Sequence, residues 1–162
     1  MLDFAVKYKD KLEELYLKNI LGNDKYKFWS YRNYWNTKFI EFSDNEWDNM
    51  FRVSVIDDKI NAFYKASIAR PENYVACLSV LSMSENNGIL LIKDLKQFVD
   101  ELLNKQNFYK IKFWVVIGNP IEKVYDKVVE DYNGRIIGTF KKEVMLVDNK
   151  LYDVKYYEVY KK

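Results

Sequence analysis

Alternating and continuous apolar segments predict several β-strands in this chain. Residues 50–57 alternate between apolar and polar side chains, a turn at 57–59 follows, and the chain then returns as a second strand to Ala69. Residues 70–73 break the chain before an apolar strand over residues 74–80. Because short connections join these three strands, we predict an antiparallel meander.

Apolar residues at three- and four-residue spacing indicate helices elsewhere in the chain. The first such segment covers residues 3–21 and stops at Gly22. A second covers residues 89–104, and a strand over residues 109–117 follows it. A strand, a long helix and a further strand predict a parallel crossover connection.

A third helix and a terminal hairpin complete the pattern. Residues 118–120 supply a glycine turn, an asparagine N-cap and a proline at the first helical position, which predicts a helix over residues 121–132. The final residues form two strands, 135–147 and 151–161, around a polar turn. The order of elements is therefore that of a mixed α and β protein.

The composition predicts one ordered globular domain over residues 1–162. The chain is 49% hydrophobic and 17% aromatic, whereas disordered chains are poor in aromatic residues. A net charge of +2 gives no strong field to attract nucleic acid or an anionic membrane. Because the sequence has neither a membrane-spanning apolar run nor the apolar run of a signal peptide, we expect a cytoplasmic protein.

The absence of histidine narrows the possible chemistry. The sequence contains no histidine, which excludes Ser-His and Cys-His nucleophilic catalysis and histidine-ligated zinc, and we expect no metal site. Cys77 lies in an apolar strand, where a small buried side chain is a simpler interpretation than a nucleophile. Proton transfer must therefore use carboxylates, tyrosine, lysine or backbone groups.

The turn between the strand 74–80 and the following helix is a candidate ligand site. It has the sequence Ser-Glu-Asn-Asn-Gly and ends at Gly88. Because the first amides of a helix have no partner within the helix, a helix that starts after a buried strand can bind a phosphate group. The alternative is an ordinary helix start that Asn86 or Asn87 caps.

The order of elements resembles the GNAT superfamily of acyl-CoA N-acyltransferases. The resemblance covers about residues 50–161 and depends on six short segments: 78–80, 88–89, 117–120, 125–127, 135–138 and 156–159. It implies an α/β (α+β) fold with a mixed, mostly antiparallel central sheet of about six to seven strands. Helices would cover both faces of this sheet, and a hairpin would end the chain.

The resemblance implies acetyl-CoA as cosubstrate and a primary amine as acceptor. In this family the cofactor lies where the fourth and fifth strands separate, and its pantetheine binds main chain corresponding to Leu78 and Val80. The amides that would hold its pyrophosphate belong to Asn86, Asn87, Gly88 and Ile89.

Two positions of the pyrophosphate loop depart from the family motif. That motif has Gln or Arg, two variable residues, Gly, any residue, and then Gly or Ala. Alignment on Gly88 places Glu85 first and Leu90 last. Glu85 brings a negative charge near an anionic ligand, and Leu90 brings a branched side chain where close backbone approach is wanted. A catalytically degenerate binding or regulatory domain is therefore the alternative function.

By the same resemblance, Tyr125 protonates the departing CoA thiolate. A phenol with a reference pKa near 10 is protonated at neutral pH and can donate. Tyr125 also lies on the apolar stripe of its helix, so an ordinary buried aromatic residue is the alternative. Asn119 is a candidate cofactor contact, with an N-cap as its alternative.

The sequence does not identify the acceptor amine or the group that deprotonates it. Without histidine the base would be a carboxylate, and the candidates are Glu41, Asp44, Glu46, Asp57 and Asp58. Nine aromatic residues between 26 and 47 predict either an acceptor pocket or local core packing. A platform for single-stranded nucleic acid over residues 25–38 is a weaker alternative, and we otherwise expect no nucleic acid or membrane partner. Both a monomer and a homodimer are compatible with the sequence.

Overall fold

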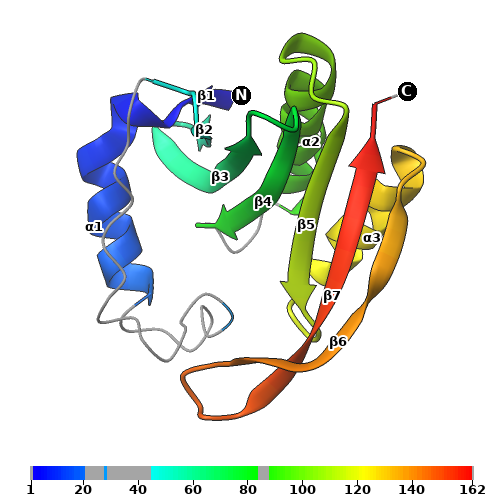
Figure 1. Ribbon diagram of the computed structural model, residues 1–162. Coiled ribbons are helices and arrows are strands. Elements are labelled where there is room, and N and C mark those ends of the chain that lie inside the picture. The colour runs from blue at the N-terminus through cyan, green and yellow to red at the C-terminus, as the bar shows by residue number, and fades with distance from the viewer. Residues whose placement is uncertain (1, 21–27, 29–44, 84–87, 162) are drawn as a thin grey trace.

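A seven-stranded sheet forms the centre of the computed structural model, which describes residues 2–20, 28, 45–83 and 88–161 (Figure 1). The strand order is β1-β2-β3-β4-β5-β7-β6. All neighbouring strands are antiparallel except β4 and β5, which are parallel. The strands are β1 (Leu2–Phe4), β2 (Asn49–Ile56), β3 (Lys59–Ala69), β4 (Tyr74–Ser82), β5 (Lys110–Val116), β6 (Arg135–Met145) and β7 (Leu151–Tyr160).

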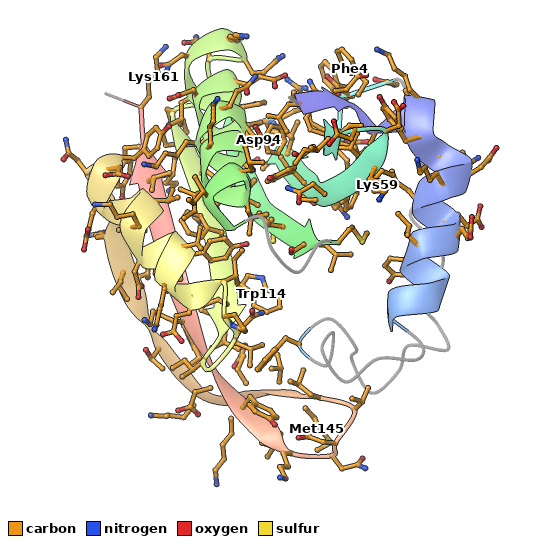
Figure 2. All side chains as sticks on the ribbon, turned by 180° about the vertical axis from the view of Figure 1, so that it is seen from behind. Phe4, Lys59, Asp94, Trp114, Met145 and Lys161 are labelled. Carbon is orange, nitrogen blue, oxygen red and sulfur yellow. The ribbon has the colours of Figure 1, made fainter. Side chains whose placement is uncertain are left out.

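Helices cover both faces of this sheet. Helix α1 (Lys9–Ile20) packs on β2 and β3 on one face, whereas α2 (Gly88–Asp100) and α3 (Glu122–Asp131) pack on the opposite face. Figure 2 shows α2 and α3 side by side in front of the sheet when the molecule is seen from behind. The predicted mixed sheet, its antiparallel meander, the parallel crossover and the terminal hairpin are all confirmed.

The prediction of one helix over residues 3–21 is wrong at its beginning. Leu2–Phe4 form strand β1, which pairs with β2, and a 3₁₀ turn over Ala5–Tyr8 leads into α1. The free edge of β2 offers backbone partners to this segment, and such long-range pairing overrides a local helical pattern. The second helix also differs, because α2 ends at Asp100 and continues as a π-helix over Glu101–Lys105.

Two apolar layers hold the helices on the sheet. The larger layer packs α2 and α3 against the sheet and includes the fully buried Tyr64, Phe98 and Phe113. Burial of each such side chain contributes roughly 1.5–3 kcal/mol. The smaller layer packs α1 against β2 and β3, with Leu12 and Phe63 buried within it. Both layers come from strands that alternate between the two faces, as the sequence pattern predicts.

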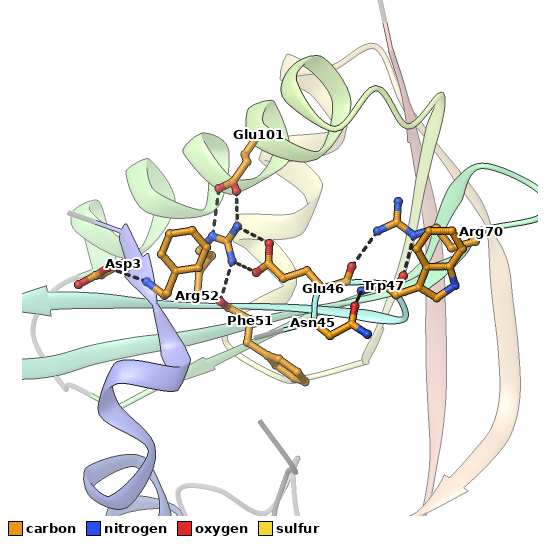
Figure 3. A network of polar contacts seen from close by, with 9 residues as sticks. Asp3, Asn45, Glu46, Trp47, Phe51, Arg52, Arg70 and Glu101 are labelled. Carbon is orange, nitrogen blue, oxygen red and sulfur yellow. Dashed lines mark hydrogen bonds and ion pairs between the residues drawn. The ribbon is translucent and has the colours of Figure 1, made fainter. Parts of the chain in front are cut away.

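A buried arginine joins four segments at one end of the sheet (Figure 3). The guanidinium of Arg52 on β2 donates to the carboxylates of Glu46 and Glu101 and, at 2.9 Å, to the carbonyl of Phe51. It also lies 4.3 Å from the ring centroid of Phe4 on β1. Since the Arg52 side chain is only 5% exposed, this network fixes β1, the segment before β2 and the π-helix together.

Candidate active site

The parallel strands β4 and β5 pair over only part of their length. Their last pair is Leu78 with Phe113, although β4 continues to Ser82 and β5 to Val116. Figure 1 shows the two strands diverging toward these ends. Among the described residues, β4 therefore continues beyond its last pair with β5.

A bulge in β4 accounts for this divergence. The register with β3 moves from Ser67–Cys77 to Ile68–Val75, and the register with β5 shifts over the same part of β4. One extra residue in a strand bends that strand and increases its twist. The bulge therefore turns the second half of β4 away from β5.

Tyr125 of α3 lies at the point where the strands separate. Its side chain is 3% exposed, and its ring packs edge-on against Phe113 of β5, with the centroids 4.9 Å apart. Burial raises the pKa of Tyr125 above its ordinary value of 10.0, and a hydrogen bond from the backbone of Val80 opposes the rise. The hydroxyl is therefore protonated at neutral pH and lies at the main chain of β4.

The structure thus brings together two of the predicted site residues, Tyr125 and Val80. The side chains of Leu78 and Val80 are buried among α2 and α3, with exposures of 2% and 4%. Leu78 pairs with Phe113 of β5, whereas Val80 lies beyond this last pair, so the main chain of Val80 is the nearer candidate for contact with a ligand between the strands. That both residues bind the cofactor through the backbone stays a prediction.

The first two residues of α2, Gly88 and Ile89, are exposed. A Cβ atom placed on Gly88 would meet nothing within 4 Å, and the Ile89 side chain is 85% exposed. The first amides of α2 need partners from outside the helix. Three residues of the predicted loop, Glu85, Asn86 and Asn87, lie outside the described residues.

Asn119 holds the turn between β5 and α3. Its side-chain oxygen accepts a hydrogen bond from the Ile121 amide at 3.1 Å, and its carbonyl accepts one from the Glu122 amide at 2.9 Å. The preceding Gly118 has a φ of +91°, which favours glycine. The Asn119 side chain therefore closes the turn before α3. Because α3 begins at Glu122 and its N-cap is Ile121, the predictions of Asn119 as the N-cap and of Pro120 at the first helical position are wrong by two residues.

The described candidates for the general base have structural contacts instead. Glu46 accepts hydrogen bonds from Arg52, and Asp57 and Asp58 form the tight turn between β2 and β3 with positive φ angles. Glu41 and Asp44 lie outside the described residues. No described carboxylate is thus identified as the base, and the described residues contain no cluster that could hold a metal ion.

Cys77 is less buried than the sequence predicts. It is half-buried, and its sulfur lies 3.7 Å from the hydroxyl of Ser79. Its neighbour Leu78 takes the buried position under α2 and α3, so Cys77 points to the other face of the sheet. Because nearly all residues of the strand 74–80 are apolar, the sequence did not show which of its side chains lie on each face of the sheet.

Most of the aromatic segment 26–47 lies outside the described residues. Its described members include Phe28, whose ring lies 6.3 Å from that of Tyr152, and Trp47, which is 60% exposed. The guanidinium of Arg70 lies 4.9 Å from the Trp47 ring. These contacts do not decide between an acceptor pocket and core packing.

The sequence pattern did not single out Tyr157, whose ring packs against that of Tyr125. Tyr157 on β7 is fully buried, and its ring lies 6.0 Å from that of Tyr125 and 5.1 Å from that of Phe113. The period-two pattern of the last strand could have placed Tyr157 on the helix-covered face. Its contact with Tyr125, however, joins segments too far apart in sequence for a pattern to show.

Comparison with solved structures identifies the fold. The spermidine N-acetyltransferase of Vibrio cholerae, solved in complex with CoA and spermine, matches with a TM-score of 0.74 and 12% identity, over 99% of this chain and 95% of that one. An N-acetyltransferase of Staphylococcus aureus Mu50 gives a TM-score of 0.71 and 13% identity, over 100% and 98%. The chain has the fold of the GNAT acyl-CoA N-acyltransferases, as its sequence resemblance implies.

Sequence comparisons add no closer relationship. Neither a protein-family model nor a curated protein matches the sequence. Among the described residues, no helix is long and apolar enough to cross a membrane. The assignment to this fold therefore depends on the arrangement of the elements, and the activity has to be argued from the site.

Proposed function

We propose that this protein is an N-acetyltransferase that transfers the acetyl group of acetyl-CoA to a primary amine. The observation that carries the proposal is the position of Tyr125. Its protonated hydroxyl lies at the Val80 backbone where β4 and β5 separate. A thioester placed there would contact an acid and a main-chain amide together, which are the two groups that acyl transfer requires.

The proposed reaction uses the residues of this site in sequence. The protonated amine first loses a proton to water or a carboxylate. Its neutral nitrogen then attacks the thioester carbonyl carbon, and the main-chain amide near Val80 stabilises the negative oxygen that forms. The carbon–sulfur bond then breaks, and the departing thiolate takes the proton of Tyr125. The new amide nitrogen loses its proton to water or a carboxylate, and solvent returns a proton to Tyr125. No metal is required for these steps.

The proposed position of acetyl-CoA follows the part of β4 where its pairing with β5 ends. Pantetheine would pair with the main chain of Leu78 and Val80, and the pyrophosphate would lie at the start of α2. The open space at Gly88 supports this placement. Amides of Asn86, Asn87, Gly88 and Ile89 are the proposed donors, and Asn119 is the remaining proposed contact.

A binding or regulatory domain without catalysis is the second candidate. The observation that favours it is the departure of Glu85 and Leu90 from the family motif. A carboxylate beside a pyrophosphate weakens anion binding by charge repulsion. In that case the fold would be retained for a partner rather than for a reaction.

The test is release of free CoA from acetyl-CoA in the presence of primary amines. Spermine is the first amine to try, because a solved protein of similar fold binds it together with CoA. We expect acetylation of at least one amine in a panel that also includes amino acids and peptides. No binding of acetyl-CoA would overturn the N-acetyltransferase and favour the second candidate, and binding without transfer to any amine of the panel would also favour the second candidate.

A further inference from the structure

Two contacts attach α3 to β7 beside Tyr125. Asp126, the next residue on α3, accepts a hydrogen bond from the hydroxyl of Tyr157 at 2.8 Å. The same carboxylate oxygen lies 3.3 Å from the ammonium of Lys155. Both partners come from β7, so one carboxylate joins the helix to the strand at the turn that carries Tyr125.

A second carboxylate extends this attachment to the beginning of α3. The ammonium of Lys155 lies 2.5 Å from Glu122, whose other oxygen accepts from the Gly118 amide at 3.1 Å. The Lys155 side chain is only 17% exposed. Salt screens the attraction within a partly buried ion pair less than it screens the attraction within an exposed pair. The partly buried pair of Lys155 and Glu122 therefore holds α3 and β7 together more firmly than an exposed pair would. The hydrogen bond to Glu122 is the main cause that raises the pKa of Lys155, which therefore stays charged.

The ring of Tyr157 contacts Tyr125 directly. It stacks on Phe113 with an interplanar angle of 16°, and it meets Tyr125 edge-on at 84°. Burial, followed by the Asp126 carboxylate, raises the pKa of Tyr157 above its ordinary range. Its hydroxyl therefore keeps its proton and remains a donor to Asp126. The ring is fixed at one end by stacking and at the other by a hydrogen bond.

We propose that Tyr157 and Asp126 are positioning residues that hold the Tyr125 hydroxyl at the CoA sulfur. This inference rests on the proposed function, because it assigns these two residues to the same site. Neither residue would touch the reacting atoms. Their effect would pass through the orientation of α3 and of the Tyr125 ring, and displacement of a reacting group by about 1 Å can cost on the order of 100-fold in rate.

A matched control exists on the same helix. Tyr132, at the end of α3, donates to Asp100 of α2 at 2.8 Å, the same distance as the bond from Tyr157 to Asp126. It follows Tyr125 by seven positions, and α3 ends at the residue before it. Tyr132→Phe therefore removes a bond between tyrosine and aspartate of the same length, together with a 3.1 Å hydrogen bond to the Lys96 carbonyl, away from the first turn of α3 that carries Tyr125.

The experiment compares the affinities of CoA and desulfo-CoA, which lacks the sulfur, by calorimetry. One hydrogen bond is worth about 0.5–1.5 kcal/mol, so the wild-type protein should prefer CoA by about two- to tenfold. In Tyr157→Phe, the ratio of the affinity for CoA to that for desulfo-CoA should fall close to one, while the affinity for desulfo-CoA stays the same. In Tyr132→Phe, this affinity ratio should stay at its wild-type value. In a Tyr125→Phe protein, the further change Tyr157→Phe should not alter the ratio.

Each other outcome has a distinct meaning. An unchanged preference in Tyr157→Phe, or equal weakening of both ligands, would overturn the positioning role while leaving the proposed function intact. A wild-type protein without preference would overturn the role of Tyr125 and the positioning role with it. Failure to bind either ligand would overturn the proposed function itself. Asp126→Asn provides a second variant, from which the same loss of preference is expected.

Discussion

The hydroxyl of Tyr125 owes its position to residues on three other elements. Phe113 of β5 and Tyr157 of β7 hold its ring, and the backbone of Val80 on β4 meets its oxygen. The sequence allows Tyr125 to be predicted as an acid because the resemblance singles it out. These partners could not be predicted, since each contact joins segments distant in sequence and depends on the twist of the sheet.

Replacement of Tyr125 by phenylalanine should separate catalysis from binding. The variant keeps the ring packing but cannot protonate a thiolate, so we expect turnover to fall by about 100-fold or more. Affinity for CoA should change by less than about tenfold, because at most one hydrogen bond is lost. Initial rates and calorimetry measure the two quantities. Unchanged turnover would mean that Tyr125 has only a structural role.

The pH dependence of turnover tests the protonation state of the same residue. Burial raises the pKa of Tyr125 above 10.0, and an acid is active only below its pKa. No loss of rate from Tyr125 is therefore expected as the pH rises from 7 toward 10. The measurement is kcat/KM across that range, in which an inflection that Tyr125→Phe removes would contradict the assignment.

At the scale of elements, local patterns identified the strands and helices better than their ends and partners. The alternation around the turn 57–59 located β2 and β3, and helical spacing located α2 and α3. Strand β1 was missed because its pairing with β2 is a long-range contact that no local pattern contains. The divergence of β4 from β5 likewise comes from a bulge that alternation alone did not reveal.

The proposed pyrophosphate site at the start of α2 can be tested by adding a side chain at Gly88. Because a Cβ there meets no atom within 4 Å, Gly88→Val should fold normally but occupy space proposed for pyrophosphate. We expect CoA affinity to fall at least about tenfold, corresponding to about 1.4 kcal/mol. Gly138→Val on β6 is the control, since that position is equally open. Full retention of CoA binding in Gly88→Val would mean that the pyrophosphate lies elsewhere.

The buried Arg52 network predicts a large effect on stability. Arg52→Leu leaves Glu46 and Glu101 without their shared cation at sites where they are 25% and 17% exposed. Removal of one partner from a buried pair costs about 3–5 kcal/mol, and partial exposure places our expectation near the lower value. Urea unfolding measures the change. Lys127→Leu, which breaks an ion pair with Glu130 in which the two side chains are 57% and 72% exposed, should cost less than about 1 kcal/mol.

At the scale of the whole molecule, overall charge gives little guidance to function. A net charge of +2 with no histidine predicts neither nucleic acid binding nor metal chemistry, and the fold alone is compatible with both candidate functions. The proposed function depends instead on three local features that lie on or next to β4. These are the separation from β5, the protonated Tyr125 and the open start of α2.

The most direct test of this account is thermal unfolding with and without acetyl-CoA. A ligand at about 100 times its dissociation constant stabilises the folded state by about 2.7 kcal/mol. For a chain of this length, that corresponds to a rise in melting temperature of about 5–10 °C. We predict such a rise for the wild-type protein and a smaller one for Gly88→Val. The absence of any shift at millimolar acetyl-CoA would contradict the proposal that this fold binds the cofactor.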